Sequence, residues 1–253
     1  MVQKVLDFIK KPTSRDVIIN TIGNYLSVFF TALFALILVR ILSPNQYVVL
    51  SILLGIAYVL ANVLDFGTTA TIYSEVPLLY SGRSERLYRF IKSTYFFQSL
   101  FSLIVIIFLL LFFPLLDTHF FKTGAPIWEL YLTAFSVLFL IWQNFVQNVM
   151  FAAKHFLKAN LYANLANIIK TAILFLMVWT HTVTIGGIIF VFGIVGPIIF
   201  FILLLFEKKE LFLILAKAPI HKEEFKFGYT LTYFLASQFF NLGSRMDLFL
   251  FVS

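Results

Sequence analysis

Long apolar stretches separated by short polar segments dominate this sequence. A helix needs about 20 consecutive, mostly apolar residues to cross the hydrocarbon core of a bilayer. Seven stretches reach that length, and we predict a transmembrane helix over each: Val17–Val39, Val48–Ala70, Ser93–Leu116, Ile127–Ala152, Ala159–Thr180, Ile185–Phe206 and Tyr229–Phe251. The predicted fold class is therefore all-α, a polytopic membrane protein.

The composition supports a chain that is solvated by lipid. Hydrophobic residues make up 61% of the chain and charged residues only 12%, whereas soluble domains carry about 25% charged residues. So few charges leave too little polar surface to cover a soluble fold of this size. The chain has no cysteine, which excludes disulfide scaffolds, thiolate metal sites and cysteine nucleophiles.

The basic residues predict the orientation of the helices. Four Lys and Arg precede the first span, four lie between the second and third, two between the fourth and fifth, and five between the sixth and seventh. The opposite side has only Arg40 and Lys122, and two further bases lie inside spans. Because cytoplasmic loops retain Lys and Arg, the N-terminus is predicted to be cytoplasmic.

Polar residues recur inside the spans at helical spacing. Three spans carry such a stripe on one helical face: Asn20, Asn24, Ser27 and Thr31; Tyr58, Asn62, Asp65 and Thr69; Asn160, Asn164, Asn167 and Thr171. The fourth and seventh spans carry further stripes, the latter through Gln238, Asn241 and Arg245. These stripes favour either hydrogen bonding between packed helices or a shared interior that holds water or a polar ligand. We predict that spans one, two, four, five and seven face such an interior and that spans three and six face lipid.

Ionisable residues inside spans are functional candidates because a charge in the membrane is costly. Lys170 lies near the middle of the fifth span, Asp65 in the second, and Arg245 and Asp247 in the seventh. An Asp65–Lys170 ion pair is one hypothesis. Arg40 ends the first span, where its side chain can snorkel to the membrane surface.

Motifs of catalysis and of metal or nucleotide binding are missing from the sequence. The four histidines form no HExxH spacing, and GxSxG, Walker and GxGxxG motifs are absent. We therefore expect no enzyme activity, catalytic residue, metal, cofactor or nucleic-acid partner. The glycines of the sixth span, Gly186, Gly187, Gly193 and Gly196, favour close helix packing or a hinge.

Four short segments resemble a known family. Arg40–Tyr47 resembles the Arg-x-Leu-x-Pro-x-x-Tyr-Gly turn of bacterial polysaccharide flippases of the O-antigen and teichoic type, although Val48 stands where Gly is common. These proteins belong to the MATE-like multidrug/oligosaccharidyl-lipid/polysaccharide exporter superfamily. Asp65–Gly67 resembles the family's Asp-x-Gly, Lys154–Lys170 its basic loop and polar fifth helix, and Asn241–Asp247 the first helix of its second lobe.

The resemblance implies a cavity between two lobes and a substrate, an undecaprenyl-pyrophosphate-linked oligosaccharide flipped across the bacterial cytoplasmic membrane by alternating access. Lys170 and Arg245 would bind the pyrophosphate, and Asp65 or Asp247 would be a structural partner or would bind a coupling ion, H⁺ or Na⁺. Other candidate residues of the cavity are Asn24, Arg40, Asn62, Asn164 and Asn241. Membrane lipid and other glycan-assembly membrane proteins are the further partners that it implies.

The same resemblance implies a division of the chain into residues 1–206, a six-helix lobe, residues 207–228, a cytoplasmic connector, and residues 229–253, the first helix of a second lobe. Because the family has twelve to fourteen helices, we expect the sequence to be the N-terminal part of a longer chain. Three other functions stay open: a cation-coupled drug or metabolite exporter of the same superfamily, a membrane-embedded glycan polymerase or transferase, and a scaffold without transport activity.

Overall fold

The computed structural model describes residues 12–80 and 85–243, and within these ranges it contains helices and no strand. Six of these helices are long and apolar enough to cross a membrane. The chain is therefore a multi-pass helical membrane protein. The predicted seventh span begins within the last helix, α10 (Phe227–Gly243), and the rest of it lies outside the described residues.

The described helices follow one another with short connections. The α-helices are α2 (Pro12–Ile41), α3 (Pro44–Val63), α4 (Thr68–Tyr80), α5 (Glu85–Leu116), α6 (Ile127–Ala152), α7 (Phe156–Trp179), α8 (Ile185–Phe190), α9 (Gly196–Lys217) and α10. Two π-helical segments continue α5 and join α8 to α9, namely η1 (Asp117–Phe121) and η2 (Val191–Val195), and η3 (Lys222–Glu224) is a short 3₁₀ helix. Helix α9 runs on to Lys217, so the predicted connector begins as helix.

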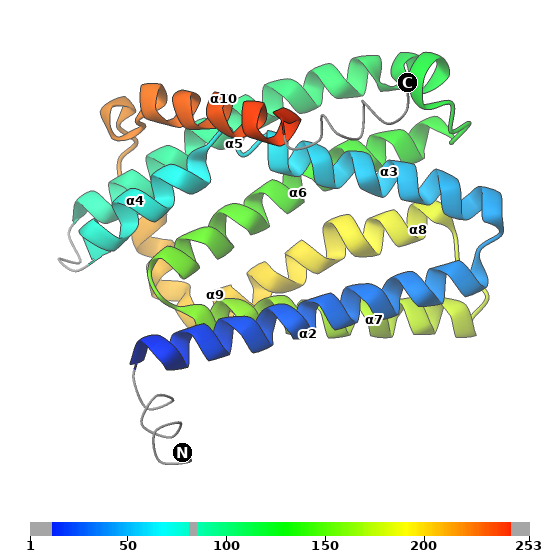
Figure 1. Cartoon of the computed structure of the whole chain (residues 1–253), viewed down its shortest axis with the longest axis horizontal. Helices are drawn as coiled ribbons and strands as arrows, with labels where there is room; N and C mark the ends of the chain where they lie inside the picture. The colour runs from blue at the N-terminus through cyan, green and yellow to red at the C-terminus, as the bar shows by residue number, and fades with distance from the viewer. Residues whose placement is uncertain (1–11, 81–84, 244–253) are drawn as a thin grey trace.

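Helix α6 forms the centre of the bundle. It runs between α2 and α7 on one side and α3, α4 and α5 on the other (Figure 1). Its apolar residues Ala134, Val137 and Ile141 are almost fully buried. The side of α5 that carries Ile104 and Leu111 is exposed, as predicted for a lipid-facing third span.

The sixth span was predicted to face lipid, and this prediction is wrong. Over half of its most apolar window, 56%, is buried, against 17% for the first span. The glycines explain the difference, because a Cβ at Gly186 would lie 1.9 Å from the Trp128 side chain and one at Gly193 would lie 2.3 Å from Ser136. A span without polar side chains can thus be central when its small residues admit a neighbouring helix.

The turn between α2 and α3 is built by the segment that resembles the flippase motif. Ser43 is the N-cap of α3, and its hydroxyl accepts a hydrogen bond from the Gln46 backbone N–H at 3.4 Å. The Gln46 side-chain oxygen in turn accepts a hydrogen bond from the Ser43 backbone N–H at 3.1 Å, which completes a capping box. Pro44 occupies the first turn, where its missing N–H costs nothing. The motif therefore has a structural explanation as a helix start.

The second span is shorter than predicted, because the chain turns after Val63 and begins a new helix at Thr68. Phe66 and Gly67 at this turn have positive φ values of 49° and 77°, a region that interrupts a right-handed helix. The predicted stripe from Tyr58 to Thr69 is thus divided between two helices. Its continuity across Asp65 was a wrong prediction.

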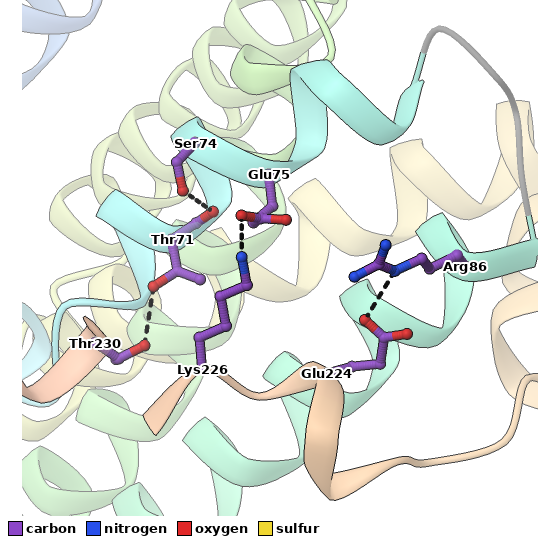
Figure 2. A network of polar contacts seen from close by, with 7 residues as sticks. All are labelled: Thr71, Ser74, Glu75, Arg86, Glu224, Lys226 and Thr230. Atoms are coloured by element: carbon purple, nitrogen blue, oxygen red, sulfur yellow. Dashed lines mark hydrogen bonds and ion pairs between the residues drawn. The ribbon is translucent and has the colours of Figure 1, made fainter. Parts of the chain in front are cut away.

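The segment after α9 returns to the bundle and packs on α4. Thr71 and Thr230 share a buried hydrogen bond of 2.9 Å between their hydroxyls. A Cβ at Gly67 would approach the Thr230 carbonyl oxygen to 2.4 Å, so only glycine admits α10 this closely. Figure 2 shows the Thr71–Thr230 hydrogen bond together with two ion pairs, Arg86–Glu224 and Lys226–Glu75.

A candidate binding site around Lys170

Helices α2 and α7 are joined by a series of hydrogen bonds that we call the amide ladder. Asn160 donates to Asn20 at 3.2 Å, Asn164 to the Gly23 carbonyl at 3.1 Å, and Asn167 to Ser27 at 3.2 Å. Two of the predicted polar stripes thus face one another. For these residues the structure favours interhelical hydrogen bonding over a water-filled interior.

Close approach of the two backbones makes the ladder possible. A Cβ at Gly23 would lie 2.4 Å from Asn160 Cγ, so a larger residue at this position would push α2 away from α7. Asn164 is 5% exposed and donates a second bond to the Asn160 carbonyl at 2.8 Å. The predicted cavity residue Asn164 therefore lies within a helix interface.

Lys170 lies about one helical turn beyond the ladder and has different neighbours. Its Nζ lies 4.2 Å from the centroid of the Phe192 ring, a cation–π geometry. The Phe192 ring in turn contacts Phe34 of α2 at 4.8 Å and Tyr58 of α3 at 5.6 Å between centroids. Residues from α2, α3, α7 and η2 thus converge on one aromatic ring. We call Lys170, Phe192, Phe34 and Tyr58 the Lys170 cluster.

The backbone of the sixth span makes room for the lysine. A Cβ at Gly196 would lie 2.5 Å from Lys170 Cδ, so the lysine stem rests where a side chain would otherwise be. A hollow of about 10 Å³ beside the amine is lined by residues that include Thr31, Asn167 and Thr171. That space is roughly enough for one water molecule. The amine therefore lies beside hydroxyl and amide groups as well as aromatic rings.

Lys170 has no acidic partner among the described side chains. The three ion pairs found there are Arg86–Glu224, Lys158–Glu207 and Lys226–Glu75. The hypothesis of an Asp65–Lys170 pair is therefore wrong for this structure. An ammonium group without a carboxylate in a membrane helix is costly. The face of the Phe192 ring offsets part of that cost, and an anionic ligand would offset more of it.

The Asp65 carboxylate stabilises the turn between α3 and α4. Its Oδ1 accepts hydrogen bonds from the hydroxyls of Thr68 at 2.8 Å and Thr69 at 2.9 Å, and its Oδ2 accepts one from the Thr69 N–H at 3.2 Å. Thr69 also accepts a bond from Asn148 of α6 at 2.8 Å. The carboxylate thus caps the start of α4 and links it to α6.

The other predicted site residues do not join the Lys170 cluster. Asn24 and Asn62 are exposed on α2 and α3, and Arg40 is exposed in the last turn of α2. Asn241 belongs to the final turn of α10, where only the backbone is described, and Arg245 and Asp247 lie outside the described residues. A binding role for these six residues stays a prediction.

Sequence reasoning missed Phe192, Phe34 and Tyr58 as partners of Lys170. Phenylalanine is so frequent here, with 33 residues, that a single ring carries no signal. The helix around Phe192 widens into the π-helical segment Val191–Val195, and such segments are frequent at functional sites. Two sequence signals were available: the pair Gly196–Pro197, which follows directly, and Tyr58, which belongs to the polar stripe of the second predicted span.

No group of three or more His, Cys, Asp or Glu that could hold a metal ion occurs in the part of the chain that the structure describes. Comparisons with protein families, with curated proteins and with solved structures found no match to this chain.

Proposed function

We propose that this chain lines the pathway of a transporter that carries a lipid-linked oligosaccharide with an anionic phosphate group across the bacterial cytoplasmic membrane. The observation that carries the proposal is Lys170. Its amine lies near the middle of a membrane helix, against Phe192 and without a carboxylate partner in the described chain. Such an amine attracts a phosphate oxygen through a charge-assisted hydrogen bond.

The surroundings of the amine suit a substrate that is both charged and rich in hydroxyls. Thr31 and Asn167 beside Lys170 offer acceptor oxygens, and the exposed amides Asn24 and Asn62 on α2 and α3, outside the Lys170 cluster, offer donors and acceptors. Sugar hydroxyls need both kinds of partner. Alternating access, H⁺ or Na⁺ coupling, and contact with other glycan-assembly proteins are parts of the same proposal.

A cation-coupled drug exporter of similar architecture is supported less well. A cationic substrate would need a carboxylate near the polar cavity. Both oxygens of Asp65 are occupied by Thr68 and Thr69, and Glu129 of α6 is buried with one oxygen bound to the Gly186 N–H. A polymerase or transferase would need a sizeable polar loop to hold catalytic groups. The connections from α2 to α3 and from α7 to α8 are too short for that.

Deletion of the gene in its own host tests the proposal. We expect loss of surface glycan and accumulation of the lipid-linked precursor on the cytoplasmic side, both restored by the wild-type gene. Normal surface glycan combined with raised sensitivity to cationic drugs would favour the drug exporter. Normal glycan and normal drug sensitivity would contradict both functions.

A further inference from the structure

A second cavity lies near the cytoplasmic end of the bundle, apart from the Lys170 cluster. It has a volume of about 430 Å³ and is enclosed by the cytoplasmic ends of α4, α5, α6 and α7 together with α9. Cavities of about 300–1,000 Å³ accommodate small-molecule ligands. None of its lining residues belongs to the Lys170 cluster, so the cavity requires an explanation of its own.

The wall of this cavity is apolar with one buried polar exception. Phe145, Val146, Val149 and Met150 of α6 supply much of the apolar lining. Tyr162 of α7 also lines the cavity and is 4% exposed, yet its hydroxyl has no hydrogen-bond partner among the described residues. A buried hydroxyl without a partner costs about 1–3 kcal/mol, and a ligand that supplies an acceptor oxygen removes that cost.

Polar groups gather where the cavity reaches the loop after α6. The Tyr80 hydroxyl and His155 Nε2 are 2.8 Å apart, and both residues line the cavity. Lys158, which also lines it, forms an ion pair with Glu207 near the surface. The distribution of Lys and Arg places this loop on the cytoplasmic side, at the level of lipid head groups.

We propose that this cavity binds a membrane phospholipid with an anionic head group. The acyl chain lies against Val149 and Met150, and the Tyr162 hydroxyl donates to an ester oxygen. The phosphate lies near His155 and Lys158, where it takes the place of Glu207 as the partner of the ammonium group. An apolar interior with a basic, hydrogen-bonding rim matches the two parts of such a lipid. The inference does not depend on the proposed transport activity, since it uses none of the residues assigned to that activity.

Photolabelling of the purified native protein tests the proposal. The probe is phosphatidic acid with a photoactivatable diazirine at the end of one acyl chain, and labelled peptides are identified by mass spectrometry. We expect the label to concentrate on residues 145–153. Excess unlabelled phosphatidic acid should displace it, whereas phosphatidylcholine or inorganic phosphate should not.

Two variants separate the cavity from general contact with lipid. Val149→Trp fills the cavity and should abolish labelling of residues 145–153, whereas Leu111→Trp, at a position 72% exposed on α5, should leave it unchanged. Tyr162→Phe keeps the ring and should weaken displacement by phosphatidic acid about two- to tenfold, the value of one hydrogen bond. The Phe variant tests the site even if the Trp variant fails to fold.

Several results would overturn the proposal. Label spread evenly between residues 145–153 and the exposed side of α5 would mean lipid contact without a site. Equal displacement by phosphatidylcholine would show that the anionic head group is not recognised. Equal displacement by inorganic phosphate would show that the acyl chain is not needed for binding. Stronger displacement by a polyprenyl phosphate than by phosphatidic acid would overturn the assignment to a phospholipid.

Discussion

The amide ladder and the Lys170 cluster occupy neighbouring turns of α7, and the sequence makes them look alike. In the ladder, Asn160 and Asn167 find polar partners on α2 at 3.2 Å. About one turn further, Lys170 meets the face of Phe192 and no carboxylate of the described chain. In the ladder the neighbouring helix supplies a partner for each amide N–H, whereas the described part of the fold supplies no counter-charge for Lys170.

The difference shows that periodic polar residues in a membrane helix predict which helical face is polar. They do not predict whether that face stabilises the fold or binds a ligand. The hydrogen-bond or ion-pair partner of each polar side chain decides between these two roles. Where the neighbouring helix supplies the partner, as Ser27 does for Asn167, loss of the residue should lower stability. Where it does not, as for Lys170, loss of the residue should lower activity and leave stability nearly unchanged. Four substitutions test this contrast, from the largest expected effect on stability to the smallest, with similar effects expected for the second and third.

Gly23→Leu should have the largest effect. Its side chain would enter the space of Asn160, whose Cγ lies 2.4 Å from a Cβ at this position, and overpacking of this kind costs about 1–3 kcal/mol. Thermal unfolding in detergent measures the loss. Gly55→Leu is the matched control, because nothing lies within 4 Å of a Cβ there. Equal stability of the two variants would contradict the close α2–α7 interface.

Asn164→Ala should lower the free energy of unfolding by about 1 kcal/mol, since interhelical hydrogen bonds in membranes are worth about 0.6–2 kcal/mol. The variant removes the bonds to the carbonyls of Gly23 and Asn160. The exposed Asn24 on α2 provides the comparison: Asn24→Ala should leave stability unchanged. If Asn164→Ala had the same free energy of unfolding as wild type but transported poorly, the amide ladder would have a role in substrate binding and not in stability.

Asp65→Ala should lower stability by about 0.5–2 kcal/mol, the usual cost of losing a helix cap. Asp65→Asn keeps the Oδ1 acceptor for Thr68 and Thr69 and should retain most of the stability and the activity. Unfolding and transport are measured on both variants. Complete loss of transport in a stable Asn variant would show that the negative charge itself is required, in favour of ion coupling at Asp65.

Gly196→Ala should change stability least, because the gain in helix propensity of up to about 1 kcal/mol opposes the crowding. The new methyl group would lie 2.5 Å from Lys170 Cδ and force the lysine stem onto another path. We expect a several-fold fall in transport. Gly228→Ala, at a position with open space, is the control, and equal transport by the two variants would contradict the role of Gly196.

The sequence predicts the helices better than it predicts their surroundings. Apolar length alone located six spans that the structure contains, because the bilayer fixes the length of a crossing helix. It missed the turn between α3 and α4, where Phe66 and Gly67 have positive φ values, since the polar residues from Tyr58 to Thr69 keep a helical spacing through that turn. It also placed the sixth span in lipid, because contacts made by glycine leave no mark in a hydropathy pattern.

The candidate site was predictable only in part. Lys170 stood out because a lysine in the middle of an apolar span is costly. Its aromatic partner Phe192 lies 22 positions further along the chain, on a helix without polar side chains. Asp65 looked equally functional in the sequence. Its structural role is seen only in the hydrogen bonds that it accepts from Thr68 and Thr69. These bonds depend on where α4 begins, which the sequence did not predict.

The most direct test of the account is the translocation of a fluorescent, pyrophosphate-linked oligosaccharide by the native protein and its Lys170→Met variant in proteoliposomes. Hydrogen bonds to charged groups are worth about 1.5–3 kcal/mol, so we predict at least about a tenfold fall in rate for Lys170→Met. Lys170→Arg should keep much of the activity, and the melting temperatures of all three proteins should agree within a few degrees. Translocation by Lys170→Met at the wild-type rate would contradict the account.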